Sequence, residues 1–236
     1  MTPTDLVLRH AGPEDRAAIA EVHLRSRLGA GDTMPPPVHP PEDVLAHFGG
    51  MDLELPSREV WVAERDGAVL GYAKVTGEWL DDLYVLPEHQ RSGVATALFE
   101  VVTAARPDGF CLLVFESNAP ARAFYARRGC IELERTGGTG NEERSPDIRV
   151  VWPGADPLAY LRRLIDDVDD VIADALLRRT ALTRAVQQVK GDGRRDPARE
   201  AEIAEHLATV VPVLGPERAA RIVDVIITES VAAAQQ

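Results

Sequence analysis

The pattern of hydrophobic and polar positions changes near Pro153. Before this residue, short apolar runs alternate with amphipathic segments, which is typical of strands that alternate with helices. The predicted strands cover residues 6–8, 59–65, 68–75, 79–85, 109–116, 130–135 and 147–152, and the predicted helices cover 13–25, 42–48, 92–105 and 119–128. Asp66-Gly67, between two strand patterns, predicts a tight β-hairpin. We therefore expect a first domain of strands and helices over residues 1–153.

The second half, residues 157–236, shows helical spacing throughout. Leu161, Ile165, Val168 and Ile172 recur at intervals that place them on one face of a helix. The three predicted helices cover residues 157–190, 197–211 and 217–234. The first would be about 50 Å long, and two short partners cannot cover its apolar stripe. A second, all-α domain that forms a homodimer is therefore expected.

Composition and charge limit the classes of partner. Of the 236 residues, 45% are hydrophobic and 27% charged, and no apolar run approaches the length of a membrane helix. The formal net charge is −12, and acidic residues outnumber basic ones on both sides of Pro153, which argues against nucleic acid. Two cysteines, Cys111 and Cys130, are too few for a disulfide framework. With no secretory pattern at the start of the sequence, we expect a cytoplasmic protein without membrane contact.

A strand, a tight loop and a helix start follow one another over residues 83–95. The candidate cofactor-binding residues here are Leu83, Tyr84, Val85, Gln90, Arg91, Ser92, Gly93, Val94 and Ala95. Free backbone N–H groups at a helix start can hold phosphate oxygens, and a glycine lets the ligand approach closely. An ordinary strand-to-helix turn would explain the glycine alone, but not the whole segment.

The segment Gln90-x-x-Gly93-x-Ala95 resembles the acyl-coenzyme A loop of the GNAT superfamily of N-acetyltransferases, Gln/Arg-x-x-Gly-x-Gly/Ala. A second segment that resembles a family pattern follows at residues 118–129, so the resemblance covers about residues 4–152. It implies a mixed sheet with flanking helices, acetyl-CoA as the cofactor and a small amine as the acetyl acceptor.

The resemblance also implies roles for individual groups. Backbone groups of residues 83–85 would hold the acetyl carbonyl and pantetheine, and the amides of residues 90–95 would hold the pyrophosphate. Asn118 would contact the pantetheine arm. Tyr125 would protonate the leaving thiolate, although a packing tyrosine would also fit this position.

The base that deprotonates the amine is less well defined. Asp81 and Asp82 at the start of the central strand are candidates, but a solvated strand end accounts for them equally well. Cys130 stands where the family often has Phe, which changes packing and not chemistry.

Lys190 is unusual because Lys74 is the only other lysine among 26 basic residues. Lysine offers a compact point charge, whereas arginine offers a planar fork. Arg179 and Lys190 are 11 positions apart, about 20° from alignment on a helix, whereas Arg162 falls about 100° away from Arg179. Two or three forks with one point charge would suit a small dianion that develops charge on one atom, although a solvated helix end also favours lysine.

These cations resemble those of the all-helical chorismate mutases, which are interlocked dimers of three-helix chains. The resemblance covers about residues 157–236. It implies that Arg179 and Arg199 bind the two substrate carboxylates and that Arg162 comes from the other subunit. Lys190 would donate to the ether oxygen as its C–O bond breaks. The reaction is pericyclic, so orientation and charge stabilisation suffice, and no metal is expected in either domain.

The remaining matched positions raise a question about rate. By resemblance, Glu200 takes the ring hydroxyl, Ser230 lies near a carboxylate, and Asp196 belongs to the substrate-binding set. Ala234 stands where the family places a second donor to the ether oxygen, Gln or Glu, and Gln235 lies about 100° further round the helix. Loss of one such donor typically costs about 10²–10³ in rate.

Several functions therefore stay open. The helical domain is expected to convert chorismate to prephenate, and the whole chain to be bifunctional. Alternatively, the domain acts on 4-amino-4-deoxychorismate, releases pyruvate from isochorismate, or only dimerises or senses a shikimate-pathway ligand. In the opposite alternative, the first half binds coenzyme A without transfer.

Overall fold

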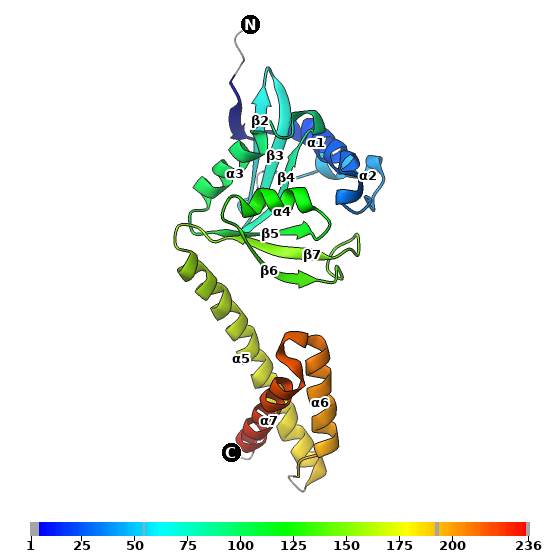
Figure 1. Ribbon diagram of the computed structural model, residues 1–236, viewed down its shortest axis with the longest axis vertical. Coiled ribbons are helices and arrows are strands. Elements are labelled where there is room, and N and C mark those ends of the chain that lie inside the picture. The colour runs from blue at the N-terminus through cyan, green and yellow to red at the C-terminus, as the bar shows by residue number, and fades with distance from the viewer. Residues whose placement is uncertain (1–4, 54, 192–193, 235–236) are drawn as a thin grey trace. The chain divides into compact units, whose positions relative to one another are not determined.

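The computed structural model describes residues 5–53, 55–191 and 194–234 (Figure 1). The chain divides into two compact units, Met1–Leu161 and Arg162–Gln236. The first unit is a mixed sheet with helices and the second is helical, as the sequence predicts. The boundary between the units lies inside one long helix, α5 (Pro157–Lys190).

The sheet of the first unit has seven strands in the order β1-β2-β3-β4-β5-β7-β6. The strands are β1 (Val7–His10), β2 (Arg58–Arg65), β3 (Ala68–Thr76), β4 (Trp79–Val85), β5 (Phe110–Phe115), β6 (Ile131–Thr136) and β7 (Asp147–Trp152). The pair β4–β5 is parallel, and the other neighbours are antiparallel. Asp66 and Gly67 both have positive φ, 54° and 77°, and form the hairpin turn predicted between β2 and β3.

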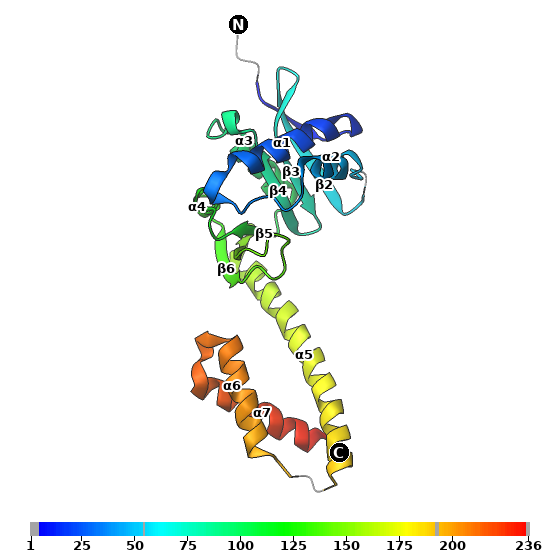
Figure 2. The same cartoon turned by 90° about the vertical axis from the view of Figure 1, so that its right-hand side faces the viewer.

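Helices cover both faces of this sheet (Figure 2). The α-helices of the unit are α1 (Arg16–Gly29), α2 (Pro41–Gly49), α3 (Val94–Ala105) and α4 (Ala119–Ala126), with short 3-10 helices at Pro13–Asp15, Gly31–Thr33 and Pro87–His89. Ile19 and Phe48, from α1 and α2, pack with Tyr72 on one face. Leu98 of α3 and Tyr125 of α4 belong to the core on the other face. The alternation of side chains along each strand produces these two cores.

The parallel strands β4 and β5 separate almost at once. Their only ladder position within the described residues is Trp79↔Cys111. On the other side of β4, the register with β3 shifts between Lys74↔Asp82 and Val75↔Leu80, so Asp81 is an extra residue on β4. A bulge of this kind bends a strand and redirects its side chains. The sheet is therefore open between β4 and β5.

The first turn of α5 belongs to the first unit. Tyr160 is only 3% exposed, and its hydroxyl lies 3.3 Å from Sγ of Cys111 on β5. Cys111 is a buried free thiol. The core of the sheet thus extends as far as Tyr160, beyond residue 153, where the sequence predicted that the first domain ends.

The second unit contains the rest of α5 with α6 (Pro197–Val210), a 3-10 helix at Pro212–Leu214 and α7 (Gly215–Ala234). The side chain of Asp196 caps α6 by accepting from the amide of Arg199. Val223 and Ile227 of α7 are buried. Several apolar side chains of α5 are exposed in the single chain: Ile165, Val168, Val171, Ile172, Leu176 and Leu177. In the described residues, no helix has the length and apolar character needed to cross a bilayer.

Candidate functional site

A cavity of about 380 Å³ opens in the first unit where β4 and β5 diverge. Leu83 and Tyr84 of β4 line it, together with Asn118 and Tyr125 of α4 and its cap. The structure therefore brings to one cavity four of the residues that the sequence predicts to contact acetyl-CoA or its leaving thiolate. Val85, at the end of the same strand, is buried, and its carbonyl oxygen accepts from Oγ of Ser26 at 2.9 Å.

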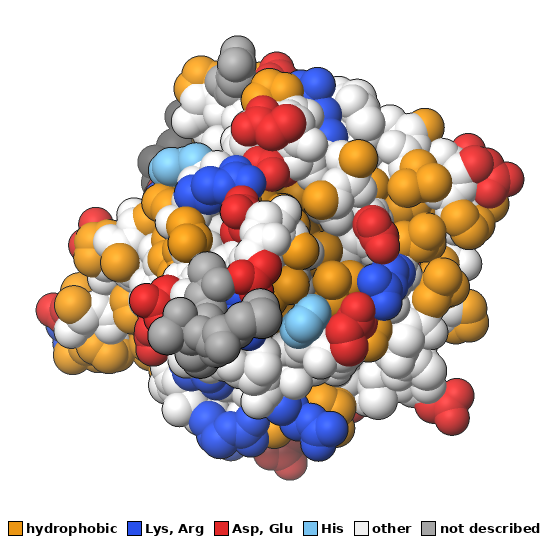
Figure 3. All heavy atoms as spheres, turned by 90° about the horizontal axis from the view of Figure 1, so that it is seen from above, with side chains coloured by type: hydrophobic (Ala, Val, Ile, Leu, Met, Phe, Trp, Pro, Cys, Tyr) orange, Lys and Arg blue, Asp and Glu red, His pale blue; other side chains and the backbone are white. Residues whose placement is uncertain are grey.

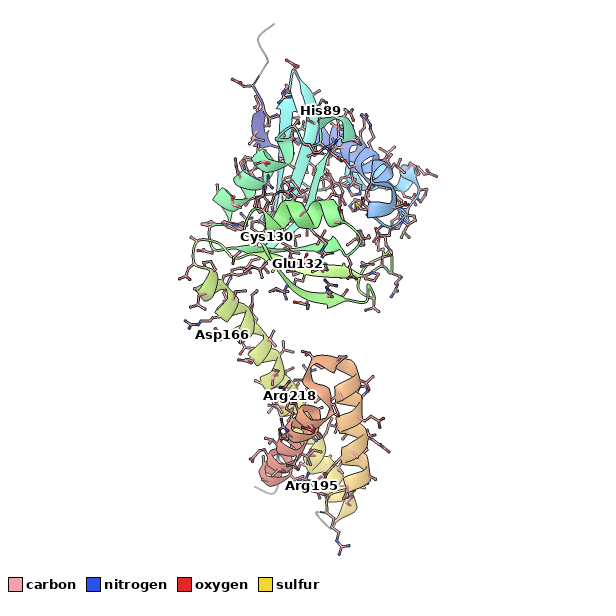
Figure 4. All side chains as sticks on the ribbon, in the orientation of Figure 1. His89, Cys130, Glu132, Asp166, Arg195 and Arg218 are labelled. Carbon is pink, nitrogen blue, oxygen red and sulfur yellow. The ribbon has the colours of Figure 1, made fainter. Side chains whose placement is uncertain are left out.

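Tyr125 lies in the wall of this cavity with its ring in the core. It is 9% exposed, and its ring centroid is 5.3 Å from that of Phe124 and 6.0 Å from that of Phe99. Burial raises the pKa of the Tyr125 phenol above its usual value, so the group stays protonated at neutral pH. Cys130 lies just after α4 (Figure 4), and burial raises the pKa of its thiol to about 12. A protonated phenol at a cavity wall can act as a general acid.

The side-chain oxygen of Asn118 makes a hydrogen bond within the fold. Its Oδ1 accepts from the amide of Ala121 at 3.1 Å and so caps α4. The Nδ2 group is a separate donor that this cap does not use. The residue can thus position α4 and contact a ligand in the cavity at the same time.

The predicted phosphate loop follows β4 directly. Gly93 caps α3 with φ 94°, a left-handed conformation that glycine adopts without strain, and open space surrounds the position of a Cβ. Arg91 also has positive φ, 58°. Ser92 Oγ donates to the carbonyl of His89 at 2.6 Å, and Gln90 Nε2 donates to that of Val85 at 3.4 Å. The first amides of α3, from Val94 and Ala95 onward, are of the kind that a helix leaves for an external acceptor.

The two candidate bases on β4 occupy different surroundings. Asp81 lines the cavity and accepts from Oγ1 of Thr76 at 2.6 Å, and partial desolvation raises the pKa of its carboxyl. Asp82 is 9% exposed and forms an ion pair with Lys74, whose Nζ lies 2.6 Å from Oδ2. Asp81 is therefore the one of the two that a ligand in the cavity can reach.

His23 of α1 is a cavity residue that sequence reasoning missed. Its Nδ1 lies 2.8 Å from the hydroxyl of Tyr72, and its ring centroid lies 4.7 Å from that of Tyr84. Burial lowers the pKa of His23, so the imidazole is neutral at neutral pH and can accept a proton. Its position four residues after buried Ile19 indicates an inward-facing side chain, but a lone histidine at such a position gives no sign of a site.

In the second unit, the predicted residues fall into separate contacts. Arg179 Nη1 donates to the carbonyl of Ile226 at 3.3 Å, and Oγ of buried Ser230 donates to the same oxygen at 2.6 Å. Arg199 lies in solvent and pairs with Glu202 at 2.7 Å. The exposed predicted residues also include Arg162 and Lys190. Asp196 serves as the cap of α6, and Gln235 lies outside the described residues.

Arg195 is a second residue that sequence reasoning missed, and it lies at the start of α6 (Figure 4). Its Nε and Nη2 each donate to one carboxylate oxygen of Glu200, both at 2.7 Å. Nη2 also lies 2.6 Å from Oδ1 of Asp224, and Nη1 donates to Thr228 at 3.0 Å. Arg195 thus ties the predicted hydroxyl acceptor Glu200 to α7. No sequence pattern indicated this contact, because it depends on the packing of α6 on α7.

Each unit contains a segment that matches the model of a domain family. Residues 56–129 match the acetyltransferase (GNAT) domain, and residues 161–235 match chorismate mutase type II. Over 79 residues, the chain is 34% identical to peptidyl-lysine N-acetyltransferase YiaC of Escherichia coli, which covers 33% of this chain and 53% of that protein. The chain spans about half the length of the curated relatives it matches. Both predicted families are confirmed at the level of domains.

Solved structures show the same fold for the first unit. The apo form of YjaB from Escherichia coli superposes with a TM-score of 0.53 at 20% identity, covering 64% of this chain and 99% of that one. The structure of yncA from Salmonella typhimurium with its cofactor acetyl-CoA gives a TM-score of 0.52 at 20% identity, covering 65% of this chain and 96% of that one. At these identities the likeness establishes the fold.

Proposed function

From a chain that joins an acetyltransferase (GNAT) domain to a chorismate mutase type II domain, we propose a bifunctional enzyme. Residues 1–153 transfer the acetyl group of acetyl-CoA to the nitrogen of a small amine. Residues 157–236 rearrange chorismate to prephenate. The observation that carries the first activity is the cavity between diverging β4 and β5, with Tyr125 and Asn118 in its wall.

The residues present fit acetyl-CoA. The amides at the start of α3 and the open space at Gly93 suit its pyrophosphate, with Arg91 adding positive charge. Nδ2 of Asn118 and the backbone of residues 83–85 suit its pantetheine arm. In the described residues, this part of β4 pairs with β3 on one side and has no ladder partner in β5 on the other. When bound, acetyl-CoA supplies an activated thioester. The relative yncA, which shares the fold, was solved with this cofactor.

Besides binding acetyl-CoA, the protein must transfer protons through its own side chains. An amine attacks only as the neutral base, so the site must accept a proton. His23 is suited to this because burial keeps its imidazole neutral, and Asp81 is suited because it is the accessible carboxylate with a raised pKa. When the thiolate of coenzyme A leaves, Tyr125 can donate its phenolic proton to it, because burial keeps the phenol protonated.

This proposal is tested by thiol release from acetyl-CoA with a panel of amines. Wild type should release thiol only when an accepting amine is present. Tyr125→Phe should lower kcat by about 10²-fold, the typical contribution of a general acid, while the KM for acetyl-CoA changes little. Phe124→Leu, on the neighbouring ring, is the packing control. Thiol release that no amine stimulates would favour coenzyme A binding without transfer.

The proposal for the second unit rests on the family match and on two structural observations. Arg179 and Ser230 both donate to the carbonyl of Ile226, and this proximity supports a shared role for the two residues at a substrate carboxylate. The exposed apolar face of α5 provides a surface on which a second copy can pack, and that packing would bring Arg162 of the partner subunit to the site. Exposed Lys190 is then available to the ether oxygen.

Ala234 bears on the rate that we propose for this reaction. With alanine at 234, the side chain at this position provides no second donor to the ether oxygen. We therefore propose a slow mutase, and the test compares chorismate with 4-amino-4-deoxychorismate and isochorismate by loss of absorbance and by product analysis. Prephenate from chorismate supports the proposal, and pyruvate from isochorismate supports a lyase. Binding without turnover of any of them supports a domain that only dimerises or senses such a ligand.

A further inference from the structure

Two loops close one side of the first unit's cavity. Residues 34–39, from the proline-rich segment, and residues 141–143, between β6 and β7, both contribute to its lining. Figure 1 shows the β6–β7 loop and the segment before α2 at the same end of the sheet. The cavity is thus bounded by sequence far from the nucleotide loop, and this part of the wall is suited to contact the acetyl acceptor.

Side-chain contacts hold these loops together. Nε2 of His39 lies 2.8 Å from Oε2 of Glu142, which joins one loop to the other. Arg27 of α1 pairs with Glu143 at 2.6 Å and also donates to the carbonyl of Pro35 at 3.4 Å. These contacts make a bounded chamber that must hold the acetyl end of the cofactor together with the acceptor, which favours a small acceptor.

The charge of this wall is negative. Asp81, Glu142, Glu143 and Asp147 contribute four carboxylates to the lining, and Arg27 contributes one guanidinium. The ion pair with Glu143 neutralises Arg27. The Asp147 carboxylate accepts from neutral donors, Oγ1 of Thr136 and Nδ2 of Asn141.

The other groups on the wall leave this excess in place. Asp81 accepts from a neutral hydroxyl, and His23 is neutral because burial lowers its pKa. Glu142 is partnered only by the exposed imidazole of His39 among the described residues. Negative charge therefore remains after every contact within the wall is counted.

The reacting nitrogen cannot balance the negative charge of the cavity wall, because this nitrogen must be neutral when it attacks the thioester. A second basic nitrogen on the same molecule would stay protonated at neutral pH, since an aliphatic ammonium has a pKa of about 10.4. We propose that the acetyl acceptor is a small diamine whose second nitrogen is protonated at neutral pH and is held by the carboxylate of Glu142. This proposal rests on the acetyl transfer proposed above.

The same wall disfavours acceptors that carry a carboxylate. Among the described residues, Arg27 is the one guanidinium in the lining, and it is already paired with Glu143 in a mostly buried position. A free amino acid would place its own carboxylate among those of the wall, and like charges at close range oppose binding. An aliphatic diamine meets no such repulsion.

The test uses acceptors of matched length: 1,4-diaminobutane, butylamine and 4-aminobutyrate, with a lysine-containing peptide as a fourth. The diamine should have a kcat/KM at least about 10-fold above butylamine, because one charge-assisted hydrogen bond contributes about 1.5–3 kcal/mol. 4-Aminobutyrate should be the poorest of the three. Added salt should reduce the preference for the diamine, since screening weakens exposed ionic contacts.

Glu142→Gln isolates the proposed contact. Glu142 is exposed, so the substitution should leave the fold intact, and it should lower kcat/KM for the diamine while that for butylamine stays unchanged. Glu132→Gln is the matched control, because Glu132, on β6, pairs with Arg122 of α4 and does not line the cavity.

Each outcome has one meaning. Equal rates with diamine and butylamine, or a better rate with the peptide, would overturn the proposed acceptor class while acetyl transfer itself stands. No acetyl-CoA-dependent transfer to any of the four would overturn both proposals together.

Discussion

Lys74 and Asp82 form an ion pair across neighbouring strands, with Nζ 2.6 Å from Oδ2. Both side chains are mostly buried, at 17% and 11% exposure, in the middle of the sheet. Because of this ion pair, the two adjacent aspartates of β4 have different surroundings. Asp82 is bound to a cation within the fold, whereas the bulge leaves Asp81 in the cavity wall.

Lys74→Ala should destabilise the first unit by about 3 kcal/mol, because it leaves a buried carboxylate without its cation. The denaturant midpoint measures this change. The double variant Lys74→Met/Asp82→Leu removes both charges and should regain most of the loss, since an apolar pair of similar size avoids the cost of burying ions. A midpoint unchanged in the single variant would mean that the pair is solvated.

Stability should fall as pH drops below about 6.5, in part through His23. Burial lowers the folded-state pKa of this imidazole below its unfolded value, so protonation favours the unfolded chain. The contribution is complete above the unfolded pKa and is lost as pH falls toward the folded one. Urea unfolding from about pH 8 to about pH 5 measures it. His23→Asn retains a polar group toward Tyr72 and should flatten the slope; an identical slope in the variant would rule out His23 as its source.

Arg179→Ala should weaken chorismate binding by about 10- to 100-fold, the range expected for a lost charged hydrogen bond. Arg178→Ala is the control one position away, because Arg178 is exposed and pairs with Asp174 along the helix. Calorimetry or KM values compare the two. Equal effects would show that general positive charge, and not the position of Arg179 beside Ser230, attracts the substrate.

Substituting Val168 and Ile172 together by Asp should convert the proposed homodimer to a monomer. These side chains are 54% and 50% exposed in the single chain, so the change should spare the fold of the protomer. Asp170→Ala, on another face of α5, is the control, and light scattering gives the mass.

A chain that ends after Leu161 should also be monomeric. That end point is preferable to one near residue 155, because Tyr160 belongs to the core of the sheet.

The sequence predicted the elements of this protein well where local chemistry determines them. Pro157 and Gly191 delimit α5, Asp196-Pro197 begins α6, and Asp66-Gly67 turns the first hairpin, all through conformational preferences of the residues themselves. The loop at Gly93 was recognisable for the same reason.

The missed features depend on contacts between distant segments. Only the assembled sheet shows that β4 and β5 diverge and that Asp81 is bulged, since a register shift leaves little trace in sequence. The contact of His23 with Tyr72 joins residues 49 positions apart, and that of Arg195 with Asp224 joins residues 29 positions apart.

The surface of the protein shows why charge alone identified few of these groups. On the face seen in Figure 3, acidic and basic side chains are interspersed with exposed apolar ones. The acetyl transfer proposed above instead depends on a few buried or cavity-lining groups such as Tyr125 and Asp81.

The central claim, two active sites in one chain, is tested most directly by measuring both reactions on the same three proteins. Tyr125→Phe should lose about 10²-fold in acetyl transfer and keep its chorismate turnover. Lys190→Ala should lose at least about 10²-fold in chorismate turnover and keep its acetyl transfer, while wild type performs both. Either substitution reducing both rates equally, or Lys190→Ala leaving chorismate turnover unchanged, would contradict this account.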